Sequence, residues 1–560
     1  MKLFSFLWQN SRGTVVSAVL VGILGGAASS GLIILVHVVL NRGEAASAAL
    51  IWSFVGLCIL LPVSRILSEM LLVVLAQKTI YDLRVRLSRQ IMNTPLRRLQ
   101  EIGTARIFAA LTEDILTIST GFASVPNLFL QTAILAGCLA YLAWLSVPVF
   151  FGVLVFLILG MFSVQMGFNK GFRFLARARE LQDHVVTHIK ALVEGTKEFK
   201  LHQARREAFL ADCLQPTADQ YRRQNIIGNG FIIATASWGQ VLFFIQMGLL
   251  IFILPAIHYL SKDGLTGYAL TVLYMMVPIG VIGSVIPNLG RASISLRKVE
   301  SLDLTLGEAR EAEGSIDTQP QSTLANLELV GVSHTYNGDN DGSKFTLGPI
   351  DLTLNSGDLV FLTGGNGSGK TTLALLLTGL YSPESGEVRL NGVPINDSNR
   401  GYYRQHFSAV FSDFYLLETL FGLQDDDLDR KAGDYLKQLH LDHKVQIRNG
   451  NLSTIELSHG QRKRLALLTA YLEDRPIYVF DEWAADQDPT FKQLFYHKLL
   501  PELKAKGKTV LVISHDDHYY NVADRIIKLD YGKIDYDTRN VASRDFRTEL
   551  ADKGLFVGQS

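Results

Sequence analysis

A glycine-rich loop between apolar segments is the first feature of this 560-residue chain that could carry out chemistry. In DLVFLTGGNGSGKTTLALLLTGL, residues 358–380, an apolar strand, a glycine loop and an amphipathic helix follow one another, and Gly364 through Thr371 match the pattern G-x-x-x-x-G-K-S/T. Glycines let backbone N–H groups turn toward phosphates, and the start of the helix adds positive potential. We expect Lys370 to reach the β and γ phosphates of a nucleotide and the Thr371 hydroxyl to bind Mg²⁺.

Two apolar strands in the same half of the chain end in groups that could complete such a site. PIYVFDE, residues 476–482, ends in two carboxylates: Asp481 could hold the Mg²⁺ shell, and Glu482 could polarise an attacking water. VLVISH, residues 510–515, brings His515 to the end of its strand. Ligands of α/β sheets bind at such strand ends, so these groups are expected to lie together.

The segment LSHGQ, residues 457–461, precedes a helical pattern. Its Ser458 and the N–H of Gly460 could therefore donate hydrogen bonds to a phosphate at the start of that helix. The glycine loop alone could be an ordinary turn. Together with the two carboxylate- and histidine-bearing strands, it indicates a nucleotide site.

The first half of the chain has a different composition and must position this site on a membrane. Overall, 48% of the residues are hydrophobic and 19% are charged, against about 25% charged in ordinary soluble domains. Apolar stretches long enough to cross a bilayer core of about 30 Å predict six spans. They lie near residues 14–40, 48–76, 121–146, 148–168, 229–258 and 265–290. The first is longer than a signal sequence, so it is interpreted as an uncleaved helix.

Charge is distributed unevenly between the halves and along the predicted loops. Residues 1–290 hold 23 Lys and Arg against 14 Asp and Glu, whereas residues 291–560 hold 30 against 39. The two long loops, 77–120 and 169–227, carry most of the basic residues of the first half. By the positive-inside bias, both loops, both termini and the second half are expected in the cytoplasm.

Those loops continue the helical period, so the helices are expected to run past the bilayer and to reverse near residues 99–107 and 191–202. The reversals could contact a cytoplasmic domain or form solvated hairpins.

Within the spans, Arg65 and Glu69 lie one helical turn apart, which favours a structural ion pair over a substrate contact. Other polar groups in the spans are expected to face the bundle interior or a wet cavity: His37, Gln131, Gln165, Gln240 and Gln246.

The polar, Gly- and Pro-containing stretch 306–323 is typical of a linker. It divides the chain into a transmembrane domain, residues 1–305, and a nucleotide-binding domain, residues 324–560. The expected fold is an α-helical six-span transmembrane domain plus an α/β P-loop NTPase domain. Three cysteines, Cys58, Cys138 and Cys213, show neither metal spacing nor a disulfide framework.

With these motifs in this order, the C-terminal half resembles the nucleotide-binding domain of ABC transporters, and the whole chain resembles an ABC exporter half-transporter. The resemblance implies ATP and Mg²⁺ as cofactors and the reversals as coupling helices. It also implies that Glu482 is the catalytic base, that His515 senses the γ-phosphate and that Lys370 binds phosphate. It also implies a homodimer, in which the LSHGQ segment of one subunit completes the ATP site of the other. The implied nucleotide-binding residues are Tyr336, against adenine, with Gly364, Asn366, Gly367, Ser368, Gly369, Lys370, Thr371, Thr372, Ser458, Gly460 and Gln461.

The chain departs from the family pattern at two places. Ser412 stands where the family usually has Gln, so Asp413 is either a substitute metal ligand beside Thr371 and Asp481 or a solvated loop acid. DEWAADQDP stands where the family has a Ser-Ala-Leu-Asp segment. These departures resemble a narrower branch, the bacterial exporters of cyclic peptides, siderophore precursors and microcins.

The expected function is therefore ATP-driven export of a peptide or peptide-like metabolite across the bacterial inner membrane by alternating access. A lipid or multidrug translocase is the first alternative. A nucleotide-gated membrane protein that does not cycle is the second, and Glu482 argues against it. Six spans exclude a soluble DNA-associated ATPase, so no nucleic-acid partner is expected.

Overall fold

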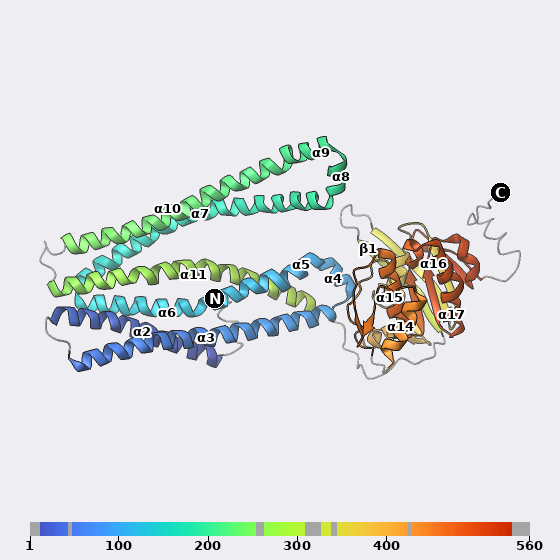
Figure 1. Ribbon diagram of the computed structural model, residues 1–560, viewed down its shortest axis with the longest axis horizontal. Coiled ribbons are helices and arrows are strands. Elements are labelled where there is room, and N and C mark those ends of the chain that lie inside the picture. Colours follow the sequence, from blue (N-terminus) through green and yellow to red (C-terminus); the bar gives the residue numbers. More distant parts are fainter. Residues whose placement is uncertain are drawn as a thin grey trace. The chain divides into compact units, whose positions relative to one another are not determined.

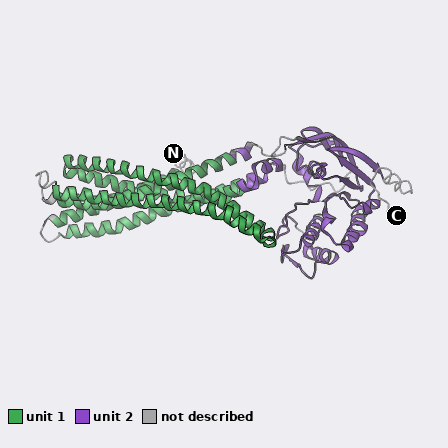
Figure 2. Cartoon of the chain, turned by 90° about the horizontal axis from the view of Figure 1, so that it is seen from above, with its two compact units in different colours: residues 1–87, 107–302 green, residues 88–106, 303–560 purple. Residues whose placement is uncertain are grey.

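The computed structural model describes residues 12–42, 47–253, 262–308, 326–337, 344–423 and 427–539. The chain divides into two compact units, one of residues 1–87 and 107–302 and the other of residues 88–106 and 303–560 (Figure 2). The first predicted reversal thus belongs to the same unit as the nucleotide motifs. Most of the predicted linker lies outside the described residues, and so do residues 1–11, which precede the predicted first span.

Long helices dominate the N-terminal part of the chain (Figure 1). Among the described residues, six helical segments are long and apolar enough to cross a membrane, which confirms the predicted six spans. Their lengths exceed the roughly 20 residues that a bilayer requires, so the expectation that they extend past it also holds for most of them. The long helices are α2 (Arg12–Arg42), α3 (Ala48–Met92), α6 (Ile115–Leu145), α7 (Val147–Glu194), α10 (Gln215–Gly248) and α11 (Lys262–Glu308).

Short helices interrupt the long ones at both predicted reversals. Gly103, at a positive φ of 85°, ends α4, and Gly195 ends α7. Each reversal continues through a π-helical turn into the next long helix, and a third π-helical turn follows α10. The bounds are α4 (Leu96–Ile102), α5 (Thr104–Ala109) and η1 (Ala110–Asp114); α8 (Thr196–Leu201), α9 (Gln203–Ala208) and η2 (Phe209–Leu214); and η3 (Leu249–Ile253).

Small residues allow the helices of the first unit to approach closely, as is common inside membranes. A Cβ atom on Gly26 would lie 2.5 Å from the Ala133 Cβ, and one on Gly121 would lie 2.2 Å from the Ala292 Cβ. The α7–α10 pair uses the same device, because a Cβ on Gly167 would lie 2.3 Å from Thr235 Oγ1. Substitution of these glycines would therefore force the helices apart.

The polar groups in the spans divide into two sets. His37, Gln131 and Gln246 are buried, as predicted, and Tyr141 Oη lies 2.5 Å from His37 Nδ1. Gln165 and Gln240 are exposed in the single chain.

Arg65 and Glu69 form the predicted ion pair on α3. The Arg65 Nε and Glu69 Oε1 atoms lie 3.0 Å apart, although both side chains are about half exposed. Pairing on one helix lowers the free-energy cost of placing both charges in a membrane span.

The second unit contains two larger sheets. The central one has six strands in the order β12-β11-β3-β10-β9-β6, all parallel except β12, and the other has four antiparallel strands in the order β2-β1-β4-β5. A two-stranded ribbon joins β7 to β8. The strands are β1 (Asn326–Asn337), β2 (Lys344–Asn355), β3 (Leu359–Gly364), β4 (Ser385–Leu390), β5 (Val393–Pro394), β6 (Phe407–Val410), β7 (Ile447–Arg448), β8 (Asn451–Leu452), β9 (Ile477–Asp481), β10 (Thr509–Ile513), β11 (Arg525–Asp530) and β12 (Lys533–Arg539).

Apolar residues on both faces of the central strands explain their burial. Every residue of β3, β9 and β10 is buried, as expected for parallel strands covered on two sides. The covering helices and helical turns are α12 (Lys370–Leu377), α13 (Arg400–Arg404), α14 (Leu428–Gln438), α15 (His459–Glu473), η5 (Trp483–Asp486), α16 (Pro489–Leu494), η6 (Phe495–Leu499), α17 (Leu500–Ala505) and η7 (Asp517–Val522).

The register of the central sheet places the chemical groups. Ile513, the last residue of β10, pairs with Asp481 on β9 and with Leu362 on β3. The carboxyl ends of these three strands therefore meet at one edge, as the motifs predict.

Candidate active site

The glycine loop after β3 forms a cradle of backbone groups. Gly364, Gly367 and Gly369 all have positive φ, and a Cβ at Gly364 would lie 2.2 Å from the Leu529 carbonyl oxygen. The side chain of Lys370 is buried, and its Nζ donates to the carbonyl oxygens of Gly364 (3.0 Å) and Gly365 (2.9 Å). Burial lowers the pKa of Lys370. A bound anion would favour the charged ammonium form, which burial disfavours because it removes the solvation by water.

The remaining loop residues lie where the motif predicts. Asn366 is exposed in the loop, and Thr372 is half-buried in the first turn of α12. The Ser368 hydroxyl is buried and has no hydrogen-bond partner among the described residues. A buried hydroxyl without a partner is costly, and a phosphate oxygen in the loop could supply one.

Asp481 is the most buried carboxylate of the site, with 1% of its surface exposed. Its Oδ2 accepts from Thr371 Oγ1 (3.1 Å) and Ser412 Oγ (3.4 Å), while Oδ1 has no partner among the described atoms. Burial, before any other cause, raises the pKa of Asp481. A carboxylate, two hydroxyls and an unused oxygen are the hard oxygen donors that Mg²⁺ prefers.

The described residues hold no cluster of three or more His, Cys, Asp or Glu side chains that could bind a metal alone. A cation beside Asp481 would therefore need further oxygens, such as those of a phosphate and water. Asp413, the candidate ligand next to Ser412, is exposed.

Glu482 follows the end of β9 in a left-handed backbone conformation, at φ 49°. That conformation is uncommon for a residue other than glycine and occurs often at functional sites. Its N–H donates to the Ile513 carbonyl oxygen (3.0 Å), and its Oε1 lies 3.4 Å from His515 Nε2. The backbone thus aims the carboxylate at the edge where β3, β9 and β10 end.

The LSHGQ segment begins α15. Ser458 is the N-cap, and with Gln461 it forms a capping box in which each side chain bonds the other's backbone N–H. A Cβ on Gly460 would lie 2.8 Å from the Asp486 carbonyl oxygen, so glycine is required by close packing against η5. Ser458, Gly460 and Gln461 therefore lie at the start of α15, beside the segment that follows Glu482.

Tyr336 lies on β1 of the antiparallel sheet, and the residue is 47% exposed, so its ring could stack on a planar ligand. The neighbouring Thr335 contacts the first reversal, because its carbonyl oxygen accepts from Arg97 of α4 (3.4 Å). Arg97 also pairs with Glu384 at 2.8 Å, and that hydrogen bond is the main reason that the pKa of Glu384 is lowered. These contacts join α4 to the strand that carries Tyr336.

Sequence reasoning missed two groups of residues in this region. Arg97 was one basic residue among many in its loop, and nothing in its spacing identified Glu384 as its partner. Lys463 belongs to no recognised motif position, and Asp486 was recognised only as part of a segment that departs from the family pattern, yet Lys463 Nζ contacts both Asp486 and the Glu482 carbonyl oxygen. The departure DEWAADQDP was the available signal for Asp486.

Comparison with known families agrees with this fold. Residues 347–485 match the family described as ABC transporter, and residues 13–190 match the ABC transporter transmembrane region. ATP-binding protein SyrD of Pseudomonas syringae pv. syringae is 35% identical over 546 residues, which cover 96% of each chain. The chain therefore belongs to the ABC transporter family, an ATP-hydrolysing family of transporters.

More distant relatives and a solved structure share the same architecture. The ATP-dependent lipid A-core flippase of Alcanivorax borkumensis is 23% identical over 82% of this chain and 80% of its own. That of Paraburkholderia xenovorans is 25% identical over 90% and 84%. A bacterial Atm1-family ABC exporter with ATP bound is 16% identical, covers 97% of both chains and superposes with a TM-score of 0.71, which supports the exporter fold. The protein is a multi-pass membrane protein with an ATP-binding domain.

Proposed function

We propose that this chain is an ATP-driven exporter of peptides or peptide-like metabolites in the bacterial inner membrane, working by alternating access. The observation that carries the proposal is the meeting of Lys370, Asp481, Glu482 and His515 at one sheet edge in a chain with six span candidates. By the positive-inside bias, the basic loops support a cytoplasmic position for the nucleotide-binding unit, where ATP is available.

Each group at the sheet edge has a distinct task in hydrolysis. Lys370 and the loop N–H groups bind and orient the phosphates. Thr371 and Asp481 would hold Mg²⁺, which neutralises phosphate charge when bound. Glu482 takes a proton from the attacking water, and His515, 3.4 Å away, orients the Glu482 carboxylate and can donate to a phosphate oxygen.

Ser412 and Asp413 compete for the role of the glutamine that the family has in this loop. Only the Ser412 hydroxyl is placed beside Asp481 Oδ2, at 3.4 Å. We therefore expect Ser412→Ala to lower the kcat of ATP hydrolysis about threefold to tenfold, the usual worth of one hydrogen bond, and Asp413→Ala to leave it nearly unchanged. Steady-state ATPase assays over a range of Mg²⁺ concentrations compare the two variants. A larger loss in Asp413→Ala would assign the metal to Asp413 instead.

A homodimer completes the site in this proposal. Ser458 and Gly460 lie at the start of α15, against the segment after Glu482, and would serve the ATP of the second copy.

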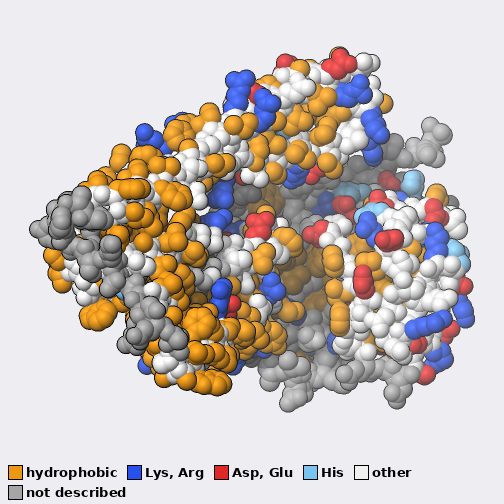
Figure 3. All heavy atoms as spheres, turned by 60° about the vertical axis from the view of Figure 1, so that its left-hand side comes forward, with side chains coloured by type: hydrophobic (Ala, Val, Ile, Leu, Met, Phe, Trp, Pro, Cys, Tyr) orange, Lys and Arg blue, Asp and Glu red, His pale blue; other side chains and the backbone are white. Residues whose placement is uncertain are grey.

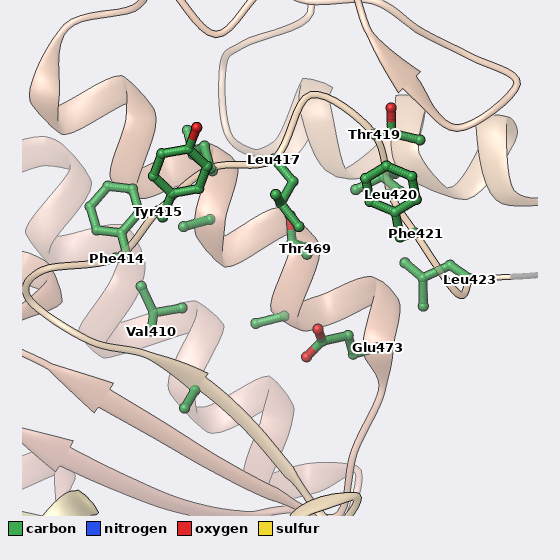
Figure 4. Close-up of a pocket in the computed structure, with 14 residues that line it drawn as sticks. Val410, Phe414, Tyr415, Leu417, Thr419, Leu420, Phe421, Leu423, Thr469 and Glu473 are labelled. Atoms are coloured by element: carbon green, nitrogen blue, oxygen red, sulfur yellow. The ribbon is translucent and has the colours of Figure 1, made fainter. Parts of the chain in front are cut away.

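A pocket of mixed polar and apolar lining in the nucleotide-binding unit is our candidate docking place for the second copy. It has a volume of about 250 Å³ and lies between the loop after β6 and α15 (Figure 4). Tyr415 and Phe421 at its rim are 84% and 71% exposed, while Glu473 lines it with a pKa raised by burial.

The membrane unit presents groups that suit a peptide. Hydrophobic side chains cover much of the face of the long helices in Figure 3, and exposed amides occur among them on α7 and α10. Gln165 donates to Asn169 (2.9 Å), and Asn229 donates to Asn225 (2.7 Å). Side-chain amides both donate and accept hydrogen bonds, and so they can match the backbone of a peptide in a low-dielectric path.

A transport assay separates the peptide proposal from its alternative. Lipid translocation is the second candidate, because two relatives are named lipid A-core flippases. In proteoliposomes, we expect ATP to drive a fluorescent cyclic lipopeptide into the vesicles in which the nucleotide-binding unit faces outward, and Glu482→Gln to abolish that uptake. Translocation of a fluorescent phospholipid without peptide uptake would favour the alternative. ATP turnover without either would contradict both.

A further inference from the structure

A buried lysine joins the signature helix to the backbone of Glu482. Only 4% of the Lys463 side chain is exposed, although it carries a charge. Its Nζ lies 2.6 Å from Asp486 Oδ2 and donates to the Glu482 carbonyl oxygen at 2.9 Å. A buried ammonium needs such partners, because its charge loses the solvation of water.

Asp486 also connects this lysine to the LSHGQ segment. The same Oδ2 atom lies 3.3 Å from His459 Nε2, so one carboxylate oxygen joins α15 at two points. The hydrogen bond from Lys463 is the main reason that the pKa of Asp486 is lowered. The three residues come from two segments of the sequence: His459 lies within LSHGQ, Lys463 lies one helical turn later, and Asp486 lies within DEWAADQDP.

Further hydrogen bonds hold the lysine backbone and the same loop in place. Trp483 Nε1, nearly completely buried, donates to the Lys463 carbonyl oxygen at 2.7 Å. Gln487 Nε2 donates to the Gly460 carbonyl oxygen at 3.0 Å, and Arg464 Nε donates to Gln487 Oε1 at 2.8 Å. The loop after Glu482 is therefore fixed to α15 along its whole length.

We infer that Lys463, held by Asp486, is a positioning residue that fixes the left-handed backbone of Glu482 and so aims the catalytic carboxylate. This inference rests on the proposed role of Glu482 in hydrolysis. The strained conformation at Glu482 would relax without an external restraint, and a charge-assisted hydrogen bond to its carbonyl oxygen is a strong one. Neither Lys463 nor Asp486 needs to touch the nucleotide for this effect.

Removal of the restraint should slow the chemical step without weakening nucleotide binding. We expect Lys463→Met and Asp486→Asn each to lower kcat about tenfold, because small misplacements of a catalytic group cost about that much or more, while KM for ATP changes less than about twofold. The double variant should resemble Lys463→Met, because both residues act through one contact. Asp486→Glu, which keeps the carboxylate, should recover part of the rate.

A second ion pair of the same unit provides the matched control. Lys528 lies 3.0 Å from Asp535 on the β11–β12 hairpin. Lys528→Met and Asp535→Asn should leave kcat and KM at the wild-type values. The full-length transporter in nanodiscs is used throughout, and rates are given per active site, counted by trapped nucleotide.

The outcomes distinguish this inference from the proposed function. If Glu482→Gln is inactive while Lys463→Met and Asp486→Asn keep the wild-type kcat per active site, the positioning role is overturned and the hydrolytic site stands. A role in stability alone would lower Tm and the number of active sites without changing kcat, and would also overturn it. If Lys463→Met does not fold, Asp486→Asn tests the positioning role in its place, because Asp486 is half-exposed. A fall in kcat without a change in KM would again support the role, and an unchanged kcat would overturn it.

Discussion

Glu482→Gln should bind ATP as the wild type does and lose most hydrolysis, by roughly 10²- to 10⁴-fold. Glutamine keeps the size of the side chain and the left-handed backbone can stay as it is, but the amide cannot accept the proton of water at neutral pH. The phosphate loop is untouched. ATPase rates and nucleotide binding to purified protein in nanodiscs measure the two effects separately.

A matched control for this variant is available on α17. Glu502 lies outside the site, where its Oε2 accepts from Gln438 Nε2 at 3.2 Å, so Glu502→Gln should hydrolyse ATP at the wild-type rate. The inactive Glu482→Gln protein should also accumulate with ATP bound. Turnover at the wild-type rate in Glu482→Gln would show that another group is the base.

The fold was predictable because its signals are long and redundant. Six apolar segments, each of span length, and a P-loop between a strand and a helix leave few other arrangements, and the predicted fold class and family are confirmed. The helical continuation of the charged loops also followed from their period. The division of the chain into two compact units was less predictable, because residues 88–106 belong to the C-terminal unit through tertiary contacts such as that of Arg97 with Glu384.

The nucleotide site was predictable to the extent that strand ends position it. A parallel strand that ends in Asp481, with Glu482 next, puts both carboxylates at the carboxyl edge of the sheet whatever its place in the strand order, and the register with β10 brings His515 beside Glu482. The roles of these residues remain predictions, as do those of Tyr336 and the LSHGQ segment.

Side-chain partners distant in sequence could not be predicted. Nothing in the spacing shows that Ser412 rather than Asp413 lies at the Asp481 carboxylate, because the direction of a loop side chain depends on backbone angles that tertiary packing sets. Similarly, Lys463 occupies a helix position that would suit an ordinary exposed lysine. It is buried because Asp486 and the Glu482 carbonyl oxygen compensate its charge.

Lys370→Ala should abolish turnover and weaken ATP binding together, which distinguishes it from Glu482→Gln. Its Nζ is held by the Gly364 and Gly365 carbonyl oxygens at the centre of the glycine loop, where a phosphate would meet a desolvated cation. Loss of one preorganised donor of this kind costs about 10²- to 10³-fold in rate.

The effect should come from the position of the charge and not from net charge. Lys508 supplies the control, because it lies outside the glycine loop and its Nζ pairs with Asp474 Oδ1 at 2.9 Å. Lys508→Ala should keep both ATP affinity and turnover. Binding is followed with a fluorescent ATP analogue, and turnover by phosphate release, in the same nanodisc preparation. Because the ammonium group stabilises the negative charge of the bound phosphates as well as that of the transition state, affinity and rate should fall in the same variant. Unchanged affinity and activity in Lys370→Ala would contradict the assignment of the glycine loop as the phosphate site.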